Sequence, residues 1–267
     1  MSITFSSCFY ILKSKFDHRI YIEWMNNFIS IVNNFNLVIY TDESTSKYID
    51  TKNNPKIKII IKPIEEFYNY TYKEYWIKNH KNNILLRDRI EWHVNMLWSE
   101  KLWFVNETIE CNYFDTEFHG WCDIGYFRND EKDTHTDLLS NWPNKMKLTK
   151  LDKEKIHYAC INNNNGELKY LYRIINSKNN VGLPFKIIPP HQQSIAGGFF
   201  ILHKDKIPWW REIYDTTLSR YFTHNYLVKD DQIILVDCIF SNMEKFNLIK
   251  ENDQKYNNWF LFQRFLL

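Results

Sequence analysis

Residues 117–129, EFHGWCDIGYFRN, place one carboxylate, Asp123, inside an apolar and aromatic run. A carboxylate in a buried strand is costly unless a partner neutralises it or donates hydrogen bonds to it. Asp123 could cap a turn or a helix, or it could lie at the end of a strand and hold a divalent cation beside a phosphate. Hard oxygen ligands suit Mg²⁺ or Mn²⁺. Asp123 is therefore the candidate metal ligand, and Gly125 would leave room for a sugar or phosphate beside it.

A glycine pair and an acidic pair are the next candidates. Gly197 and Gly198 interrupt an apolar strand pattern, which is typical of a close backbone approach or of a bulge. Asp230 and Asp231 precede Gln232 at the start of an apolar helical pattern. Acids in a first helical turn interact favourably with the helix dipole, so a purely structural role is open as well.

Two basic side chains could also contribute. Lys101 follows Val94 by seven residues, at the edge of an apolar helical stripe, and could reach phosphate oxygens or extend to solvent. Arg128 could be a second phosphate partner. His191 lies just before the glycine strand and could act as an acid, a base or a ligand, although a single histidine is more often structural or exposed.

The order of elements predicts how these groups are positioned. A strand, a helix and two strands open the chain, which is the pattern of a parallel sheet with helices on its faces. Ligands of such sheets bind beyond the carboxyl ends of the strands. We therefore expect one α/β domain with polar groups gathered at one edge. The expected strands cover 3–12, 36–44, 56–64, 118–127 and 194–207. The expected helices cover 18–32, most of 82–110, 208–227 and 230–243. The polar segment 130–180 could hold insertions or a mobile flap.

Composition excludes several classes of protein. The 267 residues carry a net charge of +2, which predicts neither nucleic-acid binding nor a strong attraction to anionic membranes. Five scattered cysteines without a CxxC pair argue against zinc or a disulfide framework. With neither a signal peptide nor a spanning segment expected, we predict a cytoplasmic protein. The apolar end, NNWFLFQRFLL, would dock on the core or make a weak membrane-surface contact.

Taken together, the motifs VIYTDES, SEKLWFVNETI, GWCDIGYFR, IAGGFFILHKD and KDDQIIL resemble, in this order, the HtrL/YibB group of glycosyltransferase-like proteins. More loosely they resemble the GT-A glycosyltransferases, whose Rossmann-type mixed sheet is flanked by helices. The resemblance spans about residues 3–240. It implies a nucleotide-sugar donor, with a UDP-sugar expected, in a half at about 1–128. A glycan, lipid-linked or protein hydroxyl acceptor is expected in a half at about 129–267 of this single domain, 1–267.

The resemblance also implies a role for each candidate. Asp231 would be the base or sugar-positioning group, with Asp230 as its substitute, and Asp123 would hold Mn²⁺ or Mg²⁺. Gln232 and His191 would lie with the glycine pair beside the acceptor and the donor sugar. The donor would contact Ser6, Thr41, Asp42, Lys101, Asp123, Gly125 and Arg128.

One departure leaves alternatives open. The common GT-A motif is Asp-any-Asp, and Gly125 stands at the second acidic position, so metal dependence is in question. A protein that keeps the fold and binds carbohydrate or nucleotide without catalysis is the main alternative. A metal-dependent hydrolase or phosphotransferase is a weaker one, since the sequence lacks a Walker-type glycine loop and a GxSxG elbow.

Overall fold

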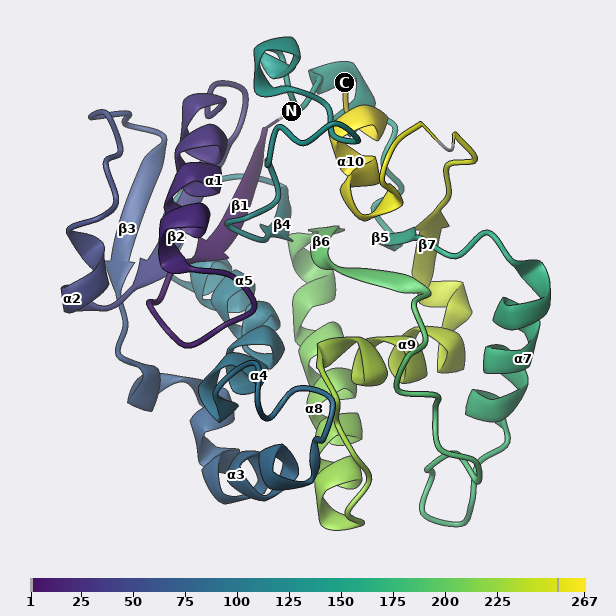
Figure 1. Cartoon of the computed structure of the whole chain (residues 1–267). Helices are drawn as coiled ribbons and strands as arrows, with labels where there is room; N and C mark the ends of the chain where they lie inside the picture. Colours follow the sequence, from purple (N-terminus) through teal and green to yellow (C-terminus); the bar gives the residue numbers. More distant parts are fainter. Residues whose placement is uncertain (1, 254) are drawn as a thin grey trace.

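The computed structural model describes residues 2–253 and 255–267. In these residues seven strands form one sheet in the order β3-β2-β1-β4-β6-β5-β7 (Figure 1). The strands are β1 (Ile3–Cys8), β2 (Asn36–Thr41), β3 (Ile57–Ile61), β4 (Phe118–Cys122), β5 (Ile156–Cys160), β6 (Ile195–His203) and β7 (Phe246–Ile249).

The first four strands are parallel. Ser6 of β1 pairs with Val38 of β2 and with Trp121 of β4, and β3 extends the same parallel ladder from β2. The parallel opening expected from the sequence is therefore confirmed. Parallel strands bring their carboxyl ends to one edge, which places the residues after β1 and β4 side by side.

Strand β6 runs antiparallel to β4, with Cys122 opposite Phe199. The beginning of β6 consequently lies beside the end of β4, and the Asp123 amide donates to the carbonyl of Gly198 (2.8 Å). Strand β5 pairs antiparallel to β6 on its other side and parallel to β7. The sheet is thus mixed, as the resemblance implied.

Helices cover both faces of the sheet, and alternate residues of β2 enter two different cores. Val38 and Tyr40 pack in one core with residues of α5, α8 and α9, whereas Leu37 and Ile39 pack in the other with residues of α1. A sheet buried on both faces needs this nearly continuous apolar pattern. The helices are α1 (His18–Ser30), α2 (Glu43–Ser46), α3 (Lys73–Asn82), α4 (Trp92–Ser99), α5 (Lys101–Glu110), α6 (Lys145–Leu148), α7 (Asn165–Asn176), α8 (Ile207–Thr223), α9 (Asp231–Ser241) and α10 (Leu261–Phe265).

Two expectations about helices and loops need correction. The helix expected over most of 82–110 is divided into α4 and α5 at Glu100, whose buried carboxylate accepts hydrogen bonds from the Tyr68 and Asn69 amides. Burial raises the pKa of Glu100 to about 7. The segment 130–180, expected to be a candidate flap, contains β5 and the amphipathic helix α7.

The C-terminal segment docks on the core. Phe262 is fully buried and stacks on Phe199 with ring centroids 4.5 Å apart, and Phe260 and Leu261 are buried beside it. Most apolar side chains of this segment are therefore unavailable to a membrane surface, and the weak membrane contact predicted there is not supported. Within the described residues, every helix is too short or too polar to cross a bilayer. The cytoplasmic location stays a prediction.

Candidate active site

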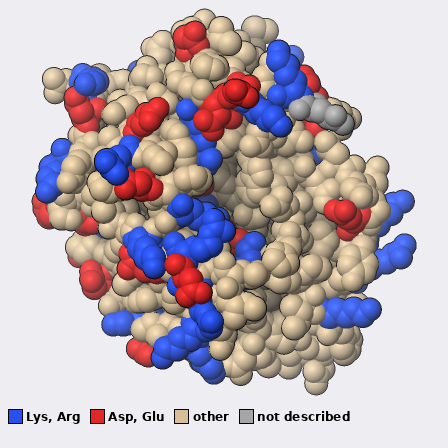
Figure 2. Space-filling model, in the orientation of Figure 1, with Lys and Arg blue, Asp and Glu red and all other residues tan. Residues whose placement is uncertain are grey.

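A central cavity of about 350 Å³ opens beyond the carboxyl ends of β1 and β4. Figure 2 shows it as a hollow in the middle of one face, bordered on the left by lysine and arginine side chains, with few charges on the right. Nine of the predicted site residues line this cavity, namely Lys101, Asp123, Gly125, Arg128, Gly197, Gly198, Asp230, Asp231 and Gln232.

Asp123 lies directly after β4 with its side chain 42% exposed to the cavity. Its Oδ1 accepts a hydrogen bond from the Trp121 indole nitrogen (2.6 Å) and lies 3.2 Å from the Lys101 ammonium nitrogen. Its Oδ2 has no hydrogen-bond partner in the described part of the chain. The carboxylate is therefore fixed through one oxygen, while the other is available to a ligand.

The glycine pair makes room for two carboxylates. A Cβ at Gly198 would lie 2.9 Å from Asp123 Oδ2, and one at Gly197 would lie 2.8 Å from Asp231 Oδ2. Carbon atoms do not approach carboxylate oxygens so closely, so neither position accepts a larger side chain without moving an acid. The sequence predicted that other atoms come close to these glycines, and the atoms that do so belong to the carboxylates of Asp123 and Asp231.

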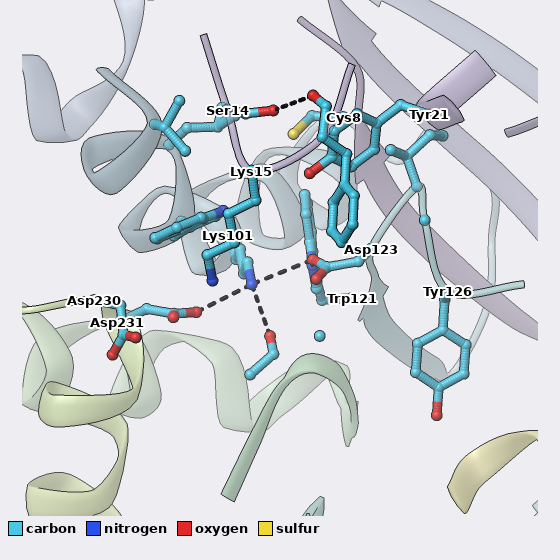
Figure 3. A pocket seen from close by; sticks show the side chains of 18 of the residues that line it. Cys8, Ser14, Lys15, Tyr21, Lys101, Trp121, Asp123, Tyr126, Asp230 and Asp231 are labelled. Atoms are coloured by element: carbon cyan, nitrogen blue, oxygen red, sulfur yellow. Dashed lines mark hydrogen bonds and ion pairs between the residues drawn. The ribbon is translucent and has the colours of Figure 1, made fainter. Parts of the chain in front are cut away.

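Lys101 begins α5 and lies between these two acids, as the close view shows (Figure 3). Its ammonium donates to Asp231 Oδ2 (3.0 Å) and to the Gly197 carbonyl (2.8 Å), in addition to its ion pair with Asp123. Burial alone would lower the pKa of Lys101, but the two carboxylates outweigh that effect and raise it. Three partners occupy the three N–H donors, so Lys101 neutralises and orients the acids and has no donor left for the phosphate role that the sequence suggested.

Asp231 is the first residue of α9 and is buried. Burial raises the pKa of this carboxyl to about 6, although the Lys101 charge opposes the shift. Asp231 is therefore ionised at neutral pH and can accept a proton, and its Oδ1 has no hydrogen-bond partner in the described residues. A carboxylate with a pKa near the working pH suits general-base chemistry.

Asp230 and Gln232 flank this acid. Asp230 Oδ2 pairs with the Lys229 ammonium at 2.9 Å, and Asp230 Oδ1 is buried without a hydrogen-bond partner among the described residues. Gln232 lines the cavity and is half-buried. The three residues DDQ thus face the cavity from the first turn of α9, as the sequence predicted for them.

Two cations remain available to an anionic ligand. The Arg128 guanidinium lies 4.2 Å from the centre of the Trp24 ring and 5.0 Å from that of Phe260, and its Nε donates to the Gly125 carbonyl. No carboxylate pairs with this guanidinium in the described residues. Lys15 places its ammonium 4.6 Å from the centre of the Trp98 ring, and desolvation by the surrounding walls lowers its pKa although the residue as a whole is exposed.

Three predicted donor contacts lie away from the central cavity. The buried Ser6 hydroxyl bonds to the Thr108 hydroxyl (2.8 Å), and the buried Thr41 hydroxyl donates to the Phe9 carbonyl (2.7 Å). Asp42 caps α2 by accepting from the Thr45 amide (2.7 Å). The structure does not support these residues as donor contacts, because their polar atoms are occupied inside the fold.

Two further expectations change. The missing side chain at Gly125 accommodates the Trp24 ring, since a Cβ there would lie 2.7 Å from Trp24 Cε3, so protein packing rather than a ligand requires this glycine. His191 is exposed and lines a different, neighbouring cavity.

The sequence missed three residues that line the cavity, Lys15 and Phe16 in a loop and Trp259 in the 3₁₀ turn Asn258–Phe260. Lys15 lies in the loop after β1, and the rule that ligands bind beyond strand ends could have identified it. Trp259 belongs to the C-terminal segment, whose sequence shows no pattern that would indicate a binding site.

The donor set fits a divalent cation only in part. Asp123 Oδ2 is a hard oxygen facing the cavity, but the described residues contain no cluster of three or more side chains able to ligate a metal. Mg²⁺ usually keeps several waters and binds one or two carboxylates together with substrate phosphates. The residues therefore suit a cation held jointly by Asp123 and a diphosphate, and do not form a closed protein cage.

No protein-family model and no curated protein matches this chain. Solved structures similar to it include mouse xyloside xylosyltransferase 1 in its apo form, with a TM-score of 0.45 and 10% identity over 93% of this chain and 85% of that one. Galactosyltransferase LgtC, in complex with donor and acceptor sugar analogues, has a TM-score of 0.43 and 11% identity over 89% of this chain and 70% of that one. At TM-scores below 0.5, these likenesses carry over neither an activity nor the role of any residue.

Proposed function

We propose that the chain is a glycosyltransferase that moves a sugar from a nucleoside-diphosphate donor, a UDP-sugar, to a hydroxyl group of a glycan acceptor. The observation that carries this proposal is the division of charge in the central cavity. Arg128 and Lys15 are two cations that form no ion pair within the described residues, and they line the same space as two carboxylates that share Lys101. The two cations suit a diphosphate, Asp123 suits a metal ion shared with that diphosphate, and Asp231 suits the reacting sugar and its acceptor. Membership of the HtrL/YibB group, which the order of motifs suggested, is part of the same proposal.

Departure of the nucleoside diphosphate builds negative charge on its phosphate oxygens. Arg128 can stabilise this charge with its terminal nitrogens, because among the described residues only its Nε donates a side-chain hydrogen bond, to the Gly125 carbonyl. Lys15 can approach the same charge from the loop after β1. A Mn²⁺ or Mg²⁺ ion at Asp123 Oδ2 would supply further stabilisation of the leaving group.

The acceptor hydroxyl must lose its proton as its oxygen attacks the anomeric carbon. We assign Asp231 as the group that accepts this proton or positions the sugar, since its carboxylate lines the cavity and is ionised above about pH 6. Lys101 is a positioning residue, because it holds Asp231 and Asp123 in place. Aromatic walls formed by Trp98, Phe16 and Trp259 reduce access of water, a competing acceptor.

Incubation with a panel of nucleotide sugars tests the proposal. We expect slow release of nucleoside diphosphate from one donor, loss of release in Asp123→Ala, and normal release in Asp205→Ala, a control at an exposed acid outside the cavity. Calorimetry with UDP and Mn²⁺ measures donor binding without any need for the acceptor. If no nucleotide binds and no donor is cleaved, the protein is not a glycosyltransferase of this kind. Binding without cleavage in the presence of acceptors would instead favour a non-catalytic protein.

A further inference from the structure

A second cavity of about 870 Å³ adjoins the central one. It lies between the beginning of α7, the residues before β6 and the segment that leads to the 3₁₀ turn Asn258–Phe260. Asn257 and Trp259 line both cavities. A ligand that extends past these two residues from the central cavity would therefore reach the second.

Uncharged amides dominate the wall of this second cavity, which we call the amide cavity. It carries one lysine, Lys132, against two acids, Glu167 and Asp253, so it offers no field for a polyanion. This agrees with the sparse charge on the right of the hollow in Figure 2. The amide side chains that line it among the described residues are Asn162, Asn163, Gln192, Gln193, Asn257 and Asn258.

Several of these amides keep unused hydrogen-bonding groups. Asn257 Oδ1 accepts from the Trp259 amide (3.0 Å), while its Nδ2 donates to no atom of the described residues. Gln192 Oε1 accepts from the Ser194 hydroxyl (2.6 Å), and Gln192 Nε2 likewise donates to no atom of the described residues. The Oδ1 atom of Asn258 is buried and has no hydrogen-bond partner in the described part of the chain. An amide offers donors and acceptors close together, which matches the adjacent hydroxyls of a sugar ring.

Aromatic rings complete the wall. Tyr170 projects from α7 with 52% of its surface exposed, and the half-buried Trp259 lies at the junction of the two cavities. Such rings combine a flat apolar face with a polar edge, so they suit the C–H face of a sugar whose hydroxyls bond to nearby amides.

We propose that the amide cavity binds the acceptor as a neutral oligosaccharide, holding the sugar units that follow the one to be modified. This inference rests on the proposed function, which sets the direction of the glycan. Its reacting end would pass Trp259 and Asn257 and point towards Asp231. The central cavity of about 350 Å³ would hold the donor and the sugar unit to be modified, and the adjoining cavity of about 870 Å³ leaves room for the units that follow it. His191, which lines the amide cavity, then contacts the acceptor.

Binding of neutral oligosaccharides to the whole chain tests this inference without catalysis. Short oligosaccharides of the common neutral hexoses, pentoses and N-acetylhexosamines, and the matching monosaccharides, are titrated by calorimetry and saturation-transfer NMR in the presence of UDP. We expect at least one oligosaccharide to bind more tightly than its monosaccharide. Tyr170→Ala should weaken that binding by about fivefold or more, through loss of ring contact.

Tyr172→Ala is the matched control, because Tyr172 lies on the same helix, is 50% exposed and does not line the amide cavity. It should leave glycan binding unchanged, and both variants should bind UDP as the parent does. Absence of oligosaccharide binding across the panel, or equal binding by the parent and Tyr170→Ala, overturns the inference even when UDP binds. Oligosaccharide binding without UDP binding supports the amide cavity as a glycan site and contradicts the donor proposal instead.

Discussion

The ammonium nitrogen of Lys101 lies 3.2 Å from Asp123 Oδ1 and 3.0 Å from Asp231 Oδ2, so a single lysine joins the end of β4 to the start of α9. The two acids are far apart in sequence, and both lie against β6, Asp231 beside Gly197 and Asp123 beside Gly198. Without a cation between them, two carboxylates in one cavity repel each other, and one of them protonates more readily.

Replacement of this lysine should therefore change the pH dependence of the protein. In Lys101→Met the loss of the positive charge raises the pKa of Asp231 above its present value of about 6. The acid limb of the pH–rate profile for donor cleavage should move to higher pH, and turnover at neutral pH should fall. Lys153→Met, which removes an exposed partner of Glu117, is the control. An unmoved acid limb in Lys101→Met would show that this lysine does not set the ionisation of Asp231.

Asp231→Asn should separate binding from turnover. The amide keeps the shape of the side chain but cannot take a proton, so we expect turnover to fall by about 10²–10⁴-fold while the Kd for UDP stays close to that of the parent. Steady-state kinetics and calorimetry measure the two quantities. Preserved turnover with weakened donor affinity would make Asp231 a donor ligand instead.

Asp231→Asn should also change stability with pH in a defined direction. Because the folded pKa of about 6 lies above the usual aspartate pKa of 3.8, the folded state binds more protons than the unfolded state between these values. The free energy of unfolding contributed by this group is therefore full below about pH 4 and is lost as pH rises through about 6. The Tm of Asp231→Asn relative to that of the parent should consequently rise between pH 4 and pH 7, measured by thermal denaturation.

A divalent cation should act through Asp123. We expect UDP to bind about tenfold or more weakly in EDTA than in Mn²⁺, since Asp123 Oδ2 and the diphosphate would share the ion. In Asp123→Asn the difference between Mn²⁺ and EDTA should nearly disappear, and calorimetry under both conditions measures it. Equal affinity of the parent chain for UDP with and without the ion would remove the metal from the proposal and leave Arg128 and Lys15 to bind the phosphates.

Local patterns in the sequence predicted much of the fold. The continuous apolar run at 37–40 in β2, whose Val38 and Ile39 enter opposite cores, indicates a strand covered on both faces. The direction of β6 does not follow from such patterns, because an antiparallel strand between parallel ones depends on which edges meet in three dimensions. The division of the helix at Glu100 depends likewise on a distant turn, whose Asn69 amide binds that carboxylate.

The site was predictable where an unusual residue interrupts an apolar run, as Asp123 does. It was not predictable where polar residues merely lie near a strand end. Ser6 and Thr41 are polar and close to strand ends, yet both hydroxyls are bound inside the protein. Asp123 differs from Ser6 and Thr41 only in the direction of its side chain, and that direction depends on the register of the strand in the sheet. The amide cavity was missed for another reason, since Asn257 and Gln192 belong to segments brought together by tertiary packing.

The glycine strand provides a test of geometry alone. In Gly198→Ala the new methyl carbon would lie 2.9 Å from Asp123 Oδ2, so the carboxylate or β6 must move. The backbone at Gly198 lies outside the left-handed region, so alanine brings no strain of its own there. We therefore expect a loss of UDP affinity of about tenfold or more in the presence of Mn²⁺, with stability lowered by only about 1–3 kcal/mol. Calorimetry and chemical denaturation measure the two effects.

Gly166→Ala is the matched control for this substitution, because the nearest atom to its new methyl group would be Asn164 Oδ1 at 3.2 Å, at the exposed start of α7. That variant should bind UDP as the parent does. If Gly198→Ala also kept full affinity, Asp123 could be displaced without consequence, and its carboxylate would not be the group that holds the donor. If Gly198→Ala lost affinity together with its folded near-ultraviolet spectrum, misfolding would account for the loss. Asp123→Asn would then test the carboxylate without altering β6, and full UDP affinity of that variant in Mn²⁺ would count against Asp123.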